Sequence, residues 1–291
     1  MARRTAIDVI CSVVCGLLLS GCGSSSNSPT PVSQLPPSLP PSAGPSVNLA
    51  PVIDSIAVSS ERVEVDSEVA LTANVKDDET PVDQLKFEWK ADAGTFSGDG
   101  PSAKWRAPKD IKTPADYQIT LTVTEPYGIP DSSGVRPQNV TSVPGPSIRV
   151  HNSSKELGDM SVQFLSEFAK SSIPASECLR DFTDSCQGKT EERGDIEANR
   201  VHYDILDSSL TLRSVSANLG SGTAKVTVAC SFTSKTKVCD PGDKLCVVGD
   251  VGTVRGDCIL TGKYEDKRWW LCDSHFAGRL IGSMRGFFGR H

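Results

Sequence analysis

Several common signatures of catalysis and metal binding are missing from this sequence of 291 residues. It has no Gly-rich phosphate loop and no Gly-x-Ser-x-Gly elbow, motifs that commonly mark nucleotide binding and serine hydrolysis. No two cysteines are spaced as Cys-x-x-Cys and the histidines are scattered, which argues against zinc. A formal net charge of −6 argues against nucleic acid as the main partner, because nucleic-acid binding favours a basic surface. The sequence therefore predicts no cofactor, no metal and no nucleic-acid partner.

The apolar run at the start of the chain is too short to span a bilayer, which takes roughly 20 residues in a helix. It extends from Ile7 to Leu19, after a positively charged start at Arg3 and Arg4. A charged start followed by a short apolar core is typical of a secretory signal peptide. An uncleaved anchor or a buried helix is the alternative.

The residues that end this run are Leu19-Ser20-Gly21-Cys22. They resemble the lipobox of bacterial lipoproteins, so residues 1–22 are predicted to be a lipoprotein signal peptide. The resemblance implies acylation of Cys22, for example with palmitate, and a membrane anchor formed by the acyl chains. In a host with two membranes, Gly23 rather than Asp after the cysteine implies export to the outer membrane.

Residues 23–50 are rich in serine and proline. Such a segment has too little apolar surface to offset the conformational entropy lost on folding. Pro-rich chains extend towards about 3.1 Å per residue. We expect a disordered stalk that holds the rest of the chain away from the lipid, with a motif for a proline-binding partner as the alternative.

The cysteines that follow the lipobox are all in the C-terminal half, and residues 51–150 contain none. This asymmetry predicts two domains. An exported chain folds in an oxidising compartment, so these cysteines are expected mainly as disulfides, and their odd number leaves at least one without a partner in the chain. The seven candidates are Cys178, Cys186, Cys230, Cys239, Cys246, Cys258 and Cys272.

Apolar and polar residues alternate in the first domain, residues 51–151, most clearly over Glu68–Val75 and Tyr117–Thr124. Several short strands at roughly ten-residue spacing favour a β-sandwich. We expect the segment from Pro126 to Pro146 to be a loop before the last strand.

Four motifs occur in a recognisable order within this domain: Phe87-Glu88-Trp89, Gly94-Thr95-Phe96, Lys104-Trp105-Arg106-Ala107-Pro108 and Tyr117–Val123. They resemble bacterial immunoglobulin-like repeats of the PKD and cadherin-like kind. The resemblance implies a spacer or a binding module. Trp89 and Trp105 are expected in the core rather than as ligand platforms, because large aromatics dominate core burial.

One acidic turn raises the question of calcium, which prefers six to eight oxygen ligands. It consists of Asp77-Asp78-Glu79 with Asp83 nearby. The turn lacks the Asp-x-Asp-Gly spacing of related calcium-binding repeats. A solvated acidic turn is therefore the favoured interpretation.

The second domain, residues 157–276, has a helical pattern first and strand patterns afterwards. Met160, Phe164 and Phe168 form one apolar stripe, Pro174 opens a second helix, and Gly188–Asn199 is a third candidate. Long alternating segments follow, ending in a hairpin around Glu265-Asp266. This order predicts an α+β domain with helices packed on a curved antiparallel sheet.

Asn199-Arg200, Tyr203 and the closing Arg268-Trp269-Trp270-Leu271-Cys272 add to this element order. Together they resemble the nuclear-transport-factor-2-like cone, also called SnoaL-like. That fold hosts both enzymes and plain binding domains, so it supplies no function by itself. The predicted fold class is thus an all-β immunoglobulin-like sandwich followed by an α+β cone.

The spacing of the cysteines predicts three bridges. Cys239 and Cys246 would close the base of a loop between two strands, and Cys178 and Cys186 would close a small loop between helical segments. In the chain-entropy account, a disulfide that closes a short loop of this kind stabilises the fold by about 2–3 kcal/mol. For Cys258 the partner is left open between Cys230 and Cys272.

Candidate catalytic groups are few. Asp273-Ser274-His275 contains the residue types of a triad, but successive side chains of a strand point to opposite faces, so Ser274 faces away from both neighbours. Two further candidate acid–base pairs are expected to be ordinary surface or structural residues. They are His202 with Asp204 and Asp195 with Glu197.

The C-terminal tail, residues 277–291, is basic and apolar. Its spacing would suit a helix on a membrane or on a partner, but glycines costing about 1 kcal/mol each relative to alanine favour a frayed segment in water.

We therefore expect an exported, lipid-anchored envelope protein that is not an enzyme and that binds or scaffolds an envelope protein partner. A hydrolase or isomerase using the cone pocket, and adhesion or glycan binding through the first domain, are the alternatives.

Overall fold

The computed structural model describes residues 47–244 and 246–281, which belong to one compact unit. The predicted signal peptide with Cys22, the stalk up to residue 46 and the tail from residue 282 lie outside the described residues. None of the described helices is long and apolar enough to cross a membrane.

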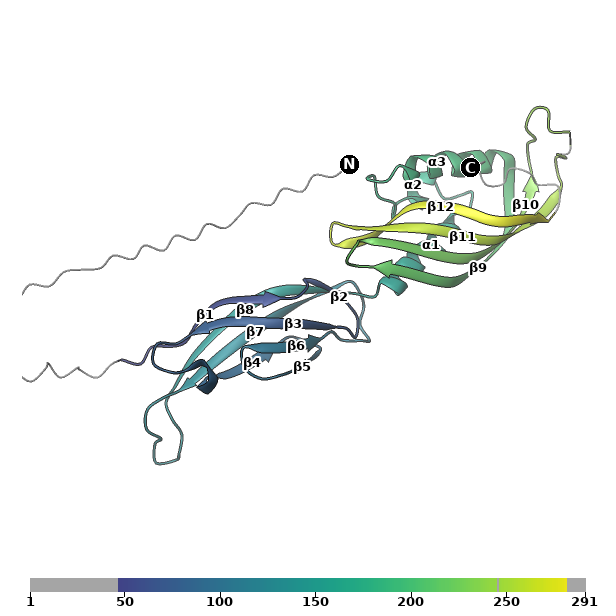
Figure 1. Ribbon diagram of the computed structural model, residues 1–291. Coiled ribbons are helices and arrows are strands. Elements are labelled where there is room, and N and C mark those ends of the chain that lie inside the picture. The colour runs from purple at the N-terminus through teal and green to yellow at the C-terminus, as the bar shows by residue number, and fades with distance from the viewer. Residues whose placement is uncertain (1–46, 245, 282–291) are drawn as a thin grey trace, which may run out of the picture. The chain divides into compact units, whose positions relative to one another are not determined.

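Two four-stranded sheets make up the first part of the described chain (Figure 1). Their strand orders are β1-β3-β6-β5 and β2-β8-β7-β4, and all neighbours are antiparallel except β2 and β8, which are parallel. A short 3₁₀ helix, Val82–Gln84, precedes β4. The strands are β1 (Val52–Val58), β2 (Arg62–Glu64), β3 (Glu68–Lys76), β4 (Lys86–Lys90), β5 (Thr95–Ser97), β6 (Ser102–Arg106), β7 (Ala115–Pro126) and β8 (Gln138–His151).

The sandwich core comes from the inward-facing residues of these strands. In β3 buried and exposed residues alternate without a break, as a strand with one face on a core requires. Trp89 and Trp105 are both buried, and each indole N–H donates to a backbone carbonyl, of Gly100 at 3.1 Å and Ala93 at 3.0 Å. Neither tryptophan is available as a ligand platform.

The segment predicted as a loop from Pro126 to Pro146 is a loop only over residues 127–137. β8 begins at Gln138, and its residues up to Pro144 pair with β7. The prediction was wrong because proline is rare inside strands and is expected at edges or bulges. Here Pro144 pairs with Thr120 beside a register shift between Gln118 and Thr120.

A third sheet and three helices form the rest of the described chain. The sheet is antiparallel with strand order β12-β11-β10-β9 (Figure 1). Asp266 and Lys267, both at positive φ, make the tight turn between β11 and β12. The elements are α1 (Ser153–Phe168), α2 (Ala175–Cys178), α3 (Gly188–His202), β9 (Tyr203–Asn218), β10 (Thr223–Thr236), β11 (Val251–Glu265) and β12 (Arg268–Ile281).

One face of this sheet is buried and the other is partly open. Along β10, Val226, Val228, Cys230 and Phe232 are buried, and they join a core with Leu157 and other apolar residues of the helices. The alternate positions of β10 are threonine, alanine and serine with intermediate exposure. The strand period therefore decides which residues meet the helices.

The predicted fold class, a sandwich followed by an α+β cone, is wrong. The described residues are mostly β, with 50% in strands and 17% helical. They form several sheets and three helices, and they do not show helices packed on a curved sheet as a cone. The helical pattern overstated the helix content because α2 is only four residues long, whereas the four strands of the third sheet have 14 to 16 residues each.

Three disulfides lie in this second part: Cys186–Cys272, Cys230–Cys258 and Cys239–Cys246. The bridge at the base of the loop between Cys239 and Cys246 is present, and Cys258 bonds to Cys230. The predicted bridge between Cys178 and Cys186 is not formed, because Cys178 is buried in the core at the end of α2 while Cys186 bonds to β12. Disulfides indicate that the chain folds in an oxidising, exported environment.

Candidate functional site

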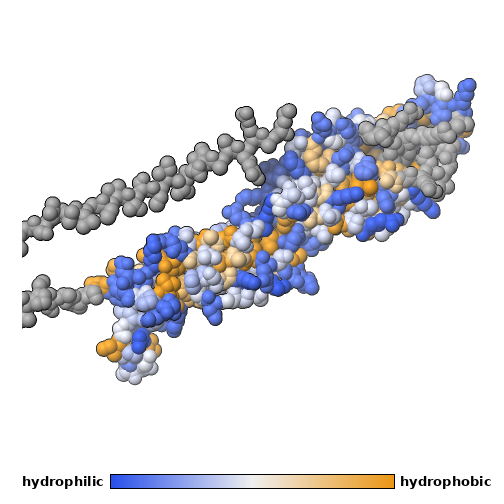
Figure 2. Space-filling view, in the orientation of Figure 1, coloured by the Kyte–Doolittle hydropathy of each residue, from blue (hydrophilic) through white to orange (hydrophobic). Residues whose placement is uncertain are grey.

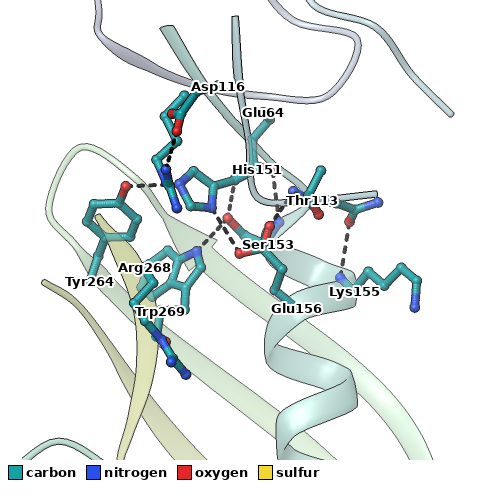
Figure 3. A network of polar contacts seen from close by, with 12 residues as sticks. Glu64, Thr113, Asp116, His151, Ser153, Lys155, Glu156, Tyr264, Arg268 and Trp269 are labelled. Atoms are coloured by element: carbon teal, nitrogen blue, oxygen red, sulfur yellow. Dashed lines mark hydrogen bonds and ion pairs between the residues drawn. The ribbon is translucent and has the colours of Figure 1, made fainter. Parts of the chain in front are cut away.

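A buried polar network joins β8, the start of α1 and the hairpin of β11 and β12 (Figure 3). Its centre is His151, the last residue of β8, which is fully buried. The imidazole Nδ1 lies 2.9 Å from a carboxylate oxygen of Glu156, and Nε2 lies 2.9 Å from the hydroxyl of Tyr264. Both ring nitrogens are therefore occupied, as a buried polar group requires.

Ser153, the first residue of α1, forms the second half of the network. Its backbone N–H donates to Glu64 at 3.0 Å and its hydroxyl donates to the same carboxylate. The indole N–H of Trp269 in turn donates to the Ser153 hydroxyl at 2.8 Å. Residues of β2, α1 and β12 are thus joined through one side chain.

Three side-chain oxygens accept hydrogen bonds from backbone N–H groups at the N-terminus of α1. The Asn152 side chain accepts from the N–H of Lys155 at 3.1 Å, and Glu156 accepts from the N–H of Asn152 at 3.0 Å. Together with Glu64, these groups use the unpaired N–H groups that every helix start presents. Two carboxylates at this end also complement the helix dipole.

The electrostatics of the network follow from these contacts. Burial raises the pKa of Glu156, but hydrogen bonds with His151 and Thr113 outweigh it, so its pKa lies below the ordinary value. Burial raises the pKa of the Tyr264 phenol. Glu156 is consequently a carboxylate at neutral pH and Tyr264 is a neutral phenol.

The Glu156–His151–Tyr264 chain has the residue types of an acid–base relay, but its geometry favours a structural role. His151 has no exposed surface, and both of its nitrogens already have partners. A general base must reach the proton that it removes, directly or through one water. The network therefore holds elements together rather than presenting a reactive group.

Two hollows flank the network and share one side chain, Arg149. The Arg62 hollow, of about 420 Å³, is lined by Ser60, Glu61, Arg62, Asp116, Ser147, Arg149, Tyr264 and Lys267. The Trp269 hollow, of about 430 Å³, is lined by Ile111, Lys112, Thr113, Pro114, Arg149, Lys155, Glu156, Asp159, Met160, Arg268 and Trp269. Both volumes are in the range of small-molecule sites.

A further cavity lies where the end of α1, the end of α3 and the start of β9 meet, but it is very small. It has a volume of about 10 Å³, close to the space of one water, and is lined in part by Asn199, Arg200 and Tyr203. A cavity of this size has no room for a substrate.

The sequence motif Asp273-Ser274-His275 does not assemble into a triad. Asp273 and His275 are exposed, while Ser274 is half-buried and its backbone N–H donates to Glu192 of α3 at 2.8 Å. The alternation of the strand separates Ser274 from its neighbours as predicted.

The other two candidate pairs are not brought together. His202 contacts the carbonyl of Val238 at 3.2 Å and Asp240 at 3.6 Å, whereas Asp204 pairs with Lys237 at 3.2 Å. Asp195 and Glu197 lie two residues apart on α3, where helical geometry turns them to different faces.

Glu192 is the ionisable residue that sequence reasoning missed. It is buried between α3 and β12, and burial raises its pKa to about 7, against the hydrogen bonds from Ser274 and together with the nearby charges of Asp273 and Asp195. Its place at the buried stripe of α3, four residues before Ile196, is the signal that could have found it.

The acidic turn forms local hydrogen bonds rather than a cation cage. Asp77 accepts from the N–H groups of Glu79 at 3.0 Å and Thr80 at 2.7 Å, an Asx-type turn. Among the residues described, no three His, Cys, Asp or Glu side chains are grouped so as to hold a metal ion.

Comparison of the chain with protein-family models, curated proteins and solved structures finds no match. The resemblances to PKD-like and nuclear-transport-factor-2-like families stay predictions.

Proposed function

We propose that the protein is an exported lipoprotein, anchored in the outer membrane through acylated Cys22, that acts as a non-catalytic binding or scaffolding module for an envelope protein. Three disulfides support export, since such bonds persist in oxidising compartments. The lipobox-like Leu19-Ser20-Gly21-Cys22 supports the anchor.

The observation that carries the non-catalytic role is the occupancy of the buried acid–base groups. His151, Glu156 and Tyr264 bond to one another, and Ser153 bonds to Glu64 and Trp269. A satisfied buried network makes one arrangement of the packed elements more specific and more rigid. Rigidity is what a module needs if it is to present a binding surface at a distance from a membrane.

The anchor is tested by metabolic labelling with an alkyne analogue of palmitate in a bacterial host with two membranes. We expect label on the wild-type chain in the outer-membrane fraction and none on Cys22→Ser. Cys15→Ser is the matched control, because it makes the same change within the predicted leader, and it should keep the label. Equal labelling of Cys22→Ser and the wild type would refute the anchor.

The scaffolding role is tested by amine-reactive cross-linking in intact cells. We expect the wild type to give discrete adducts with an envelope protein, and the Cys22→Ser chain to lose them. Cross-linking that is unchanged when the chain is released from the membrane would argue against a role at the envelope surface.

A further inference from the structure

The side chains that line the Arg62 hollow carry an excess of positive charge. Three of the side chains that line it are cations, Arg62, Arg149 and Lys267, and two are anions, Glu61 and Asp116. The whole chain has a formal net charge of −6, so a local excess of positive charge runs against the composition. Local charge of this kind concentrates oppositely charged ligands.

The partners of the three cations show how much of their charge is already neutralised. Arg149 Nη1 lies 2.6 Å from Asp116, while its Nε is buried and has no hydrogen-bond partner. The guanidinium of Arg62 lies over the ring of Tyr264, 4.6 Å from its centroid, and donates to the carbonyl of Gly220 at 3.2 Å. Neither contact of Arg62 involves a carboxylate.

Lys267 adds a third cation at the rim. It occupies the tight turn between β11 and β12, where its φ is +62°. Its backbone position is therefore fixed by a turn in which a residue with a short polar side chain is more usual. With Glu61 and Asp116 counted, the lining keeps one positive charge in excess, which would attract an anion.

Figure 2 shows hydrophilic residues interspersed with small apolar patches on the visible face.

We propose that the Arg62 hollow binds a phosphate group carried by a small molecule, held by Arg62, Arg149 and Lys267. Guanidinium groups suit phosphate because their planar array of N–H donors matches its oxygens, and the two arginines lie on different strands, β2 and β8, so that they reach the hollow from separate elements. The hydroxyl of Ser147 offers a further donor at the wall.

The hollow is larger than a phosphate ion, so it has room for the group that carries the phosphate. A volume of about 420 Å³ suits a sugar or a glycerol unit. The phosphate could come from a soluble sugar phosphate or from a phospholipid headgroup, and both present the same chemistry. This proposal rests on the binding role proposed above and names the class of ligand.

The test is isothermal titration of the full chain, purified in detergent, with two probes. Glucose 1-phosphate represents the sugar phosphate and glycerophosphoglycerol represents the headgroup, with glucose and glycerol as neutral controls. We expect saturable binding of at least one phosphorylated probe, no binding of its neutral control, and weaker binding at high salt. The probe that binds more tightly identifies the source of the phosphate.

Two variants make the test specific to this hollow. Arg62→Gln should lower the affinity for the bound probe at least tenfold. Lys267→Asn should lower this affinity severalfold, and asparagine tolerates the positive φ of this position. Lys86→Gln, the same change of charge on an exposed position of β4 outside the hollow, should bind as the wild type does.

The proposal is overturned if neither phosphorylated probe binds, if each binds no better than its neutral control, or if Lys267→Asn and Arg62→Gln both bind like Lys86→Gln. Because Lys267 is exposed, its variant stays informative even if Arg62→Gln unfolds. Acylation of Cys22 is measured separately, so failure of the anchor and failure of the phosphate site are distinguishable.

Discussion

Glu192→Gln should change how the stability of the protein depends on pH. The carboxyl group is buried between α3 and β12, accepts a hydrogen bond from the Ser274 N–H, and has its pKa raised to about 7 from 4.5. The folded state therefore binds a proton that the unfolded state has lost between these two pH values. Stability due to this group is fully present below pH 4.5 and is lost as the pH rises through about 7.

The size of the effect follows from the same two values. At about 1.4 kcal/mol per pH unit, the interval from 4.5 to about 7 corresponds to about 3 kcal/mol of unfolding free energy. A glutamine keeps an oxygen that accepts from the Ser274 N–H but never ionises. The stability of Glu192→Gln relative to the wild type should therefore rise by about 3 kcal/mol between pH 4.5 and pH 8.

Urea denaturation followed by circular dichroism at several pH values measures this difference. Comparing the variant with the wild type cancels the contribution of other carboxyl groups, such as Glu156, whose lowered pKa works in the opposite direction. Glu197→Gln is the control, since it makes the same change at an exposed position of α3 and should show no such rise. A pH-independent difference between Glu192→Gln and the wild type would refute the placement of a buried carboxyl here.

Three further predictions concern stability and reactivity. Ser153→Ala should cost about 1–3 kcal/mol in urea denaturation, because the buried Trp269 N–H and an oxygen of Glu64 lose their partner, whereas the exposed Ser154→Ala should cost much less. In the same assay Gly188→Ala should destabilise by about 1–3 kcal/mol, since its Cβ would lie 2.3 Å from the Cys272 carbonyl oxygen. Gly194→Ala meets open space and should stabilise α3 by up to about 1 kcal/mol; a loss equal to that of Gly188→Ala would contradict this reading. Cys178 should resist iodoacetamide in the native protein and react in urea, as followed by mass spectrometry, because it is buried and burial raises the pKa of its thiol; rapid labelling of the native protein would count against its burial.

Local elements were predictable where one pattern dominated. The alternation over Glu68–Val75 and Tyr117–Thr124 lies within β3 and β7, and the stripe of Met160, Phe164 and Phe168 lies in α1. A period of two residues in a strand, or of 3.6 residues in a helix, arises when one face of the element packs against the core. The hairpin around Glu265-Asp266 was predictable for the same reason.

The network and the Cys186–Cys272 disulfide could not be predicted because they depend on long-range pairing. Ser153 lies 89 residues from Glu64 and 116 residues from Trp269 along the chain. Nothing local in the sequence marks such partners. Cys178 and Cys186 are near in sequence, yet Cys186 bonds to Cys272 at a separation of 86 residues, so proximity along the chain was a poor guide.

The Cys186–Cys272 bridge also decides how the protein would carry a mechanical load. If the chain is pulled from its two ends, tension passes from residue 186 to residue 272 through the sulfur atoms and bypasses the segment between them, which includes α3, β9, β10 and β11. At about 3.4 Å per residue, roughly 290 Å of chain cannot be drawn out while the bridge is intact. The sandwich has no such shortcut, so under force it would lengthen fully, whereas the cross-linked part would lengthen only outside residues 186–272, a region that includes α1 and α2.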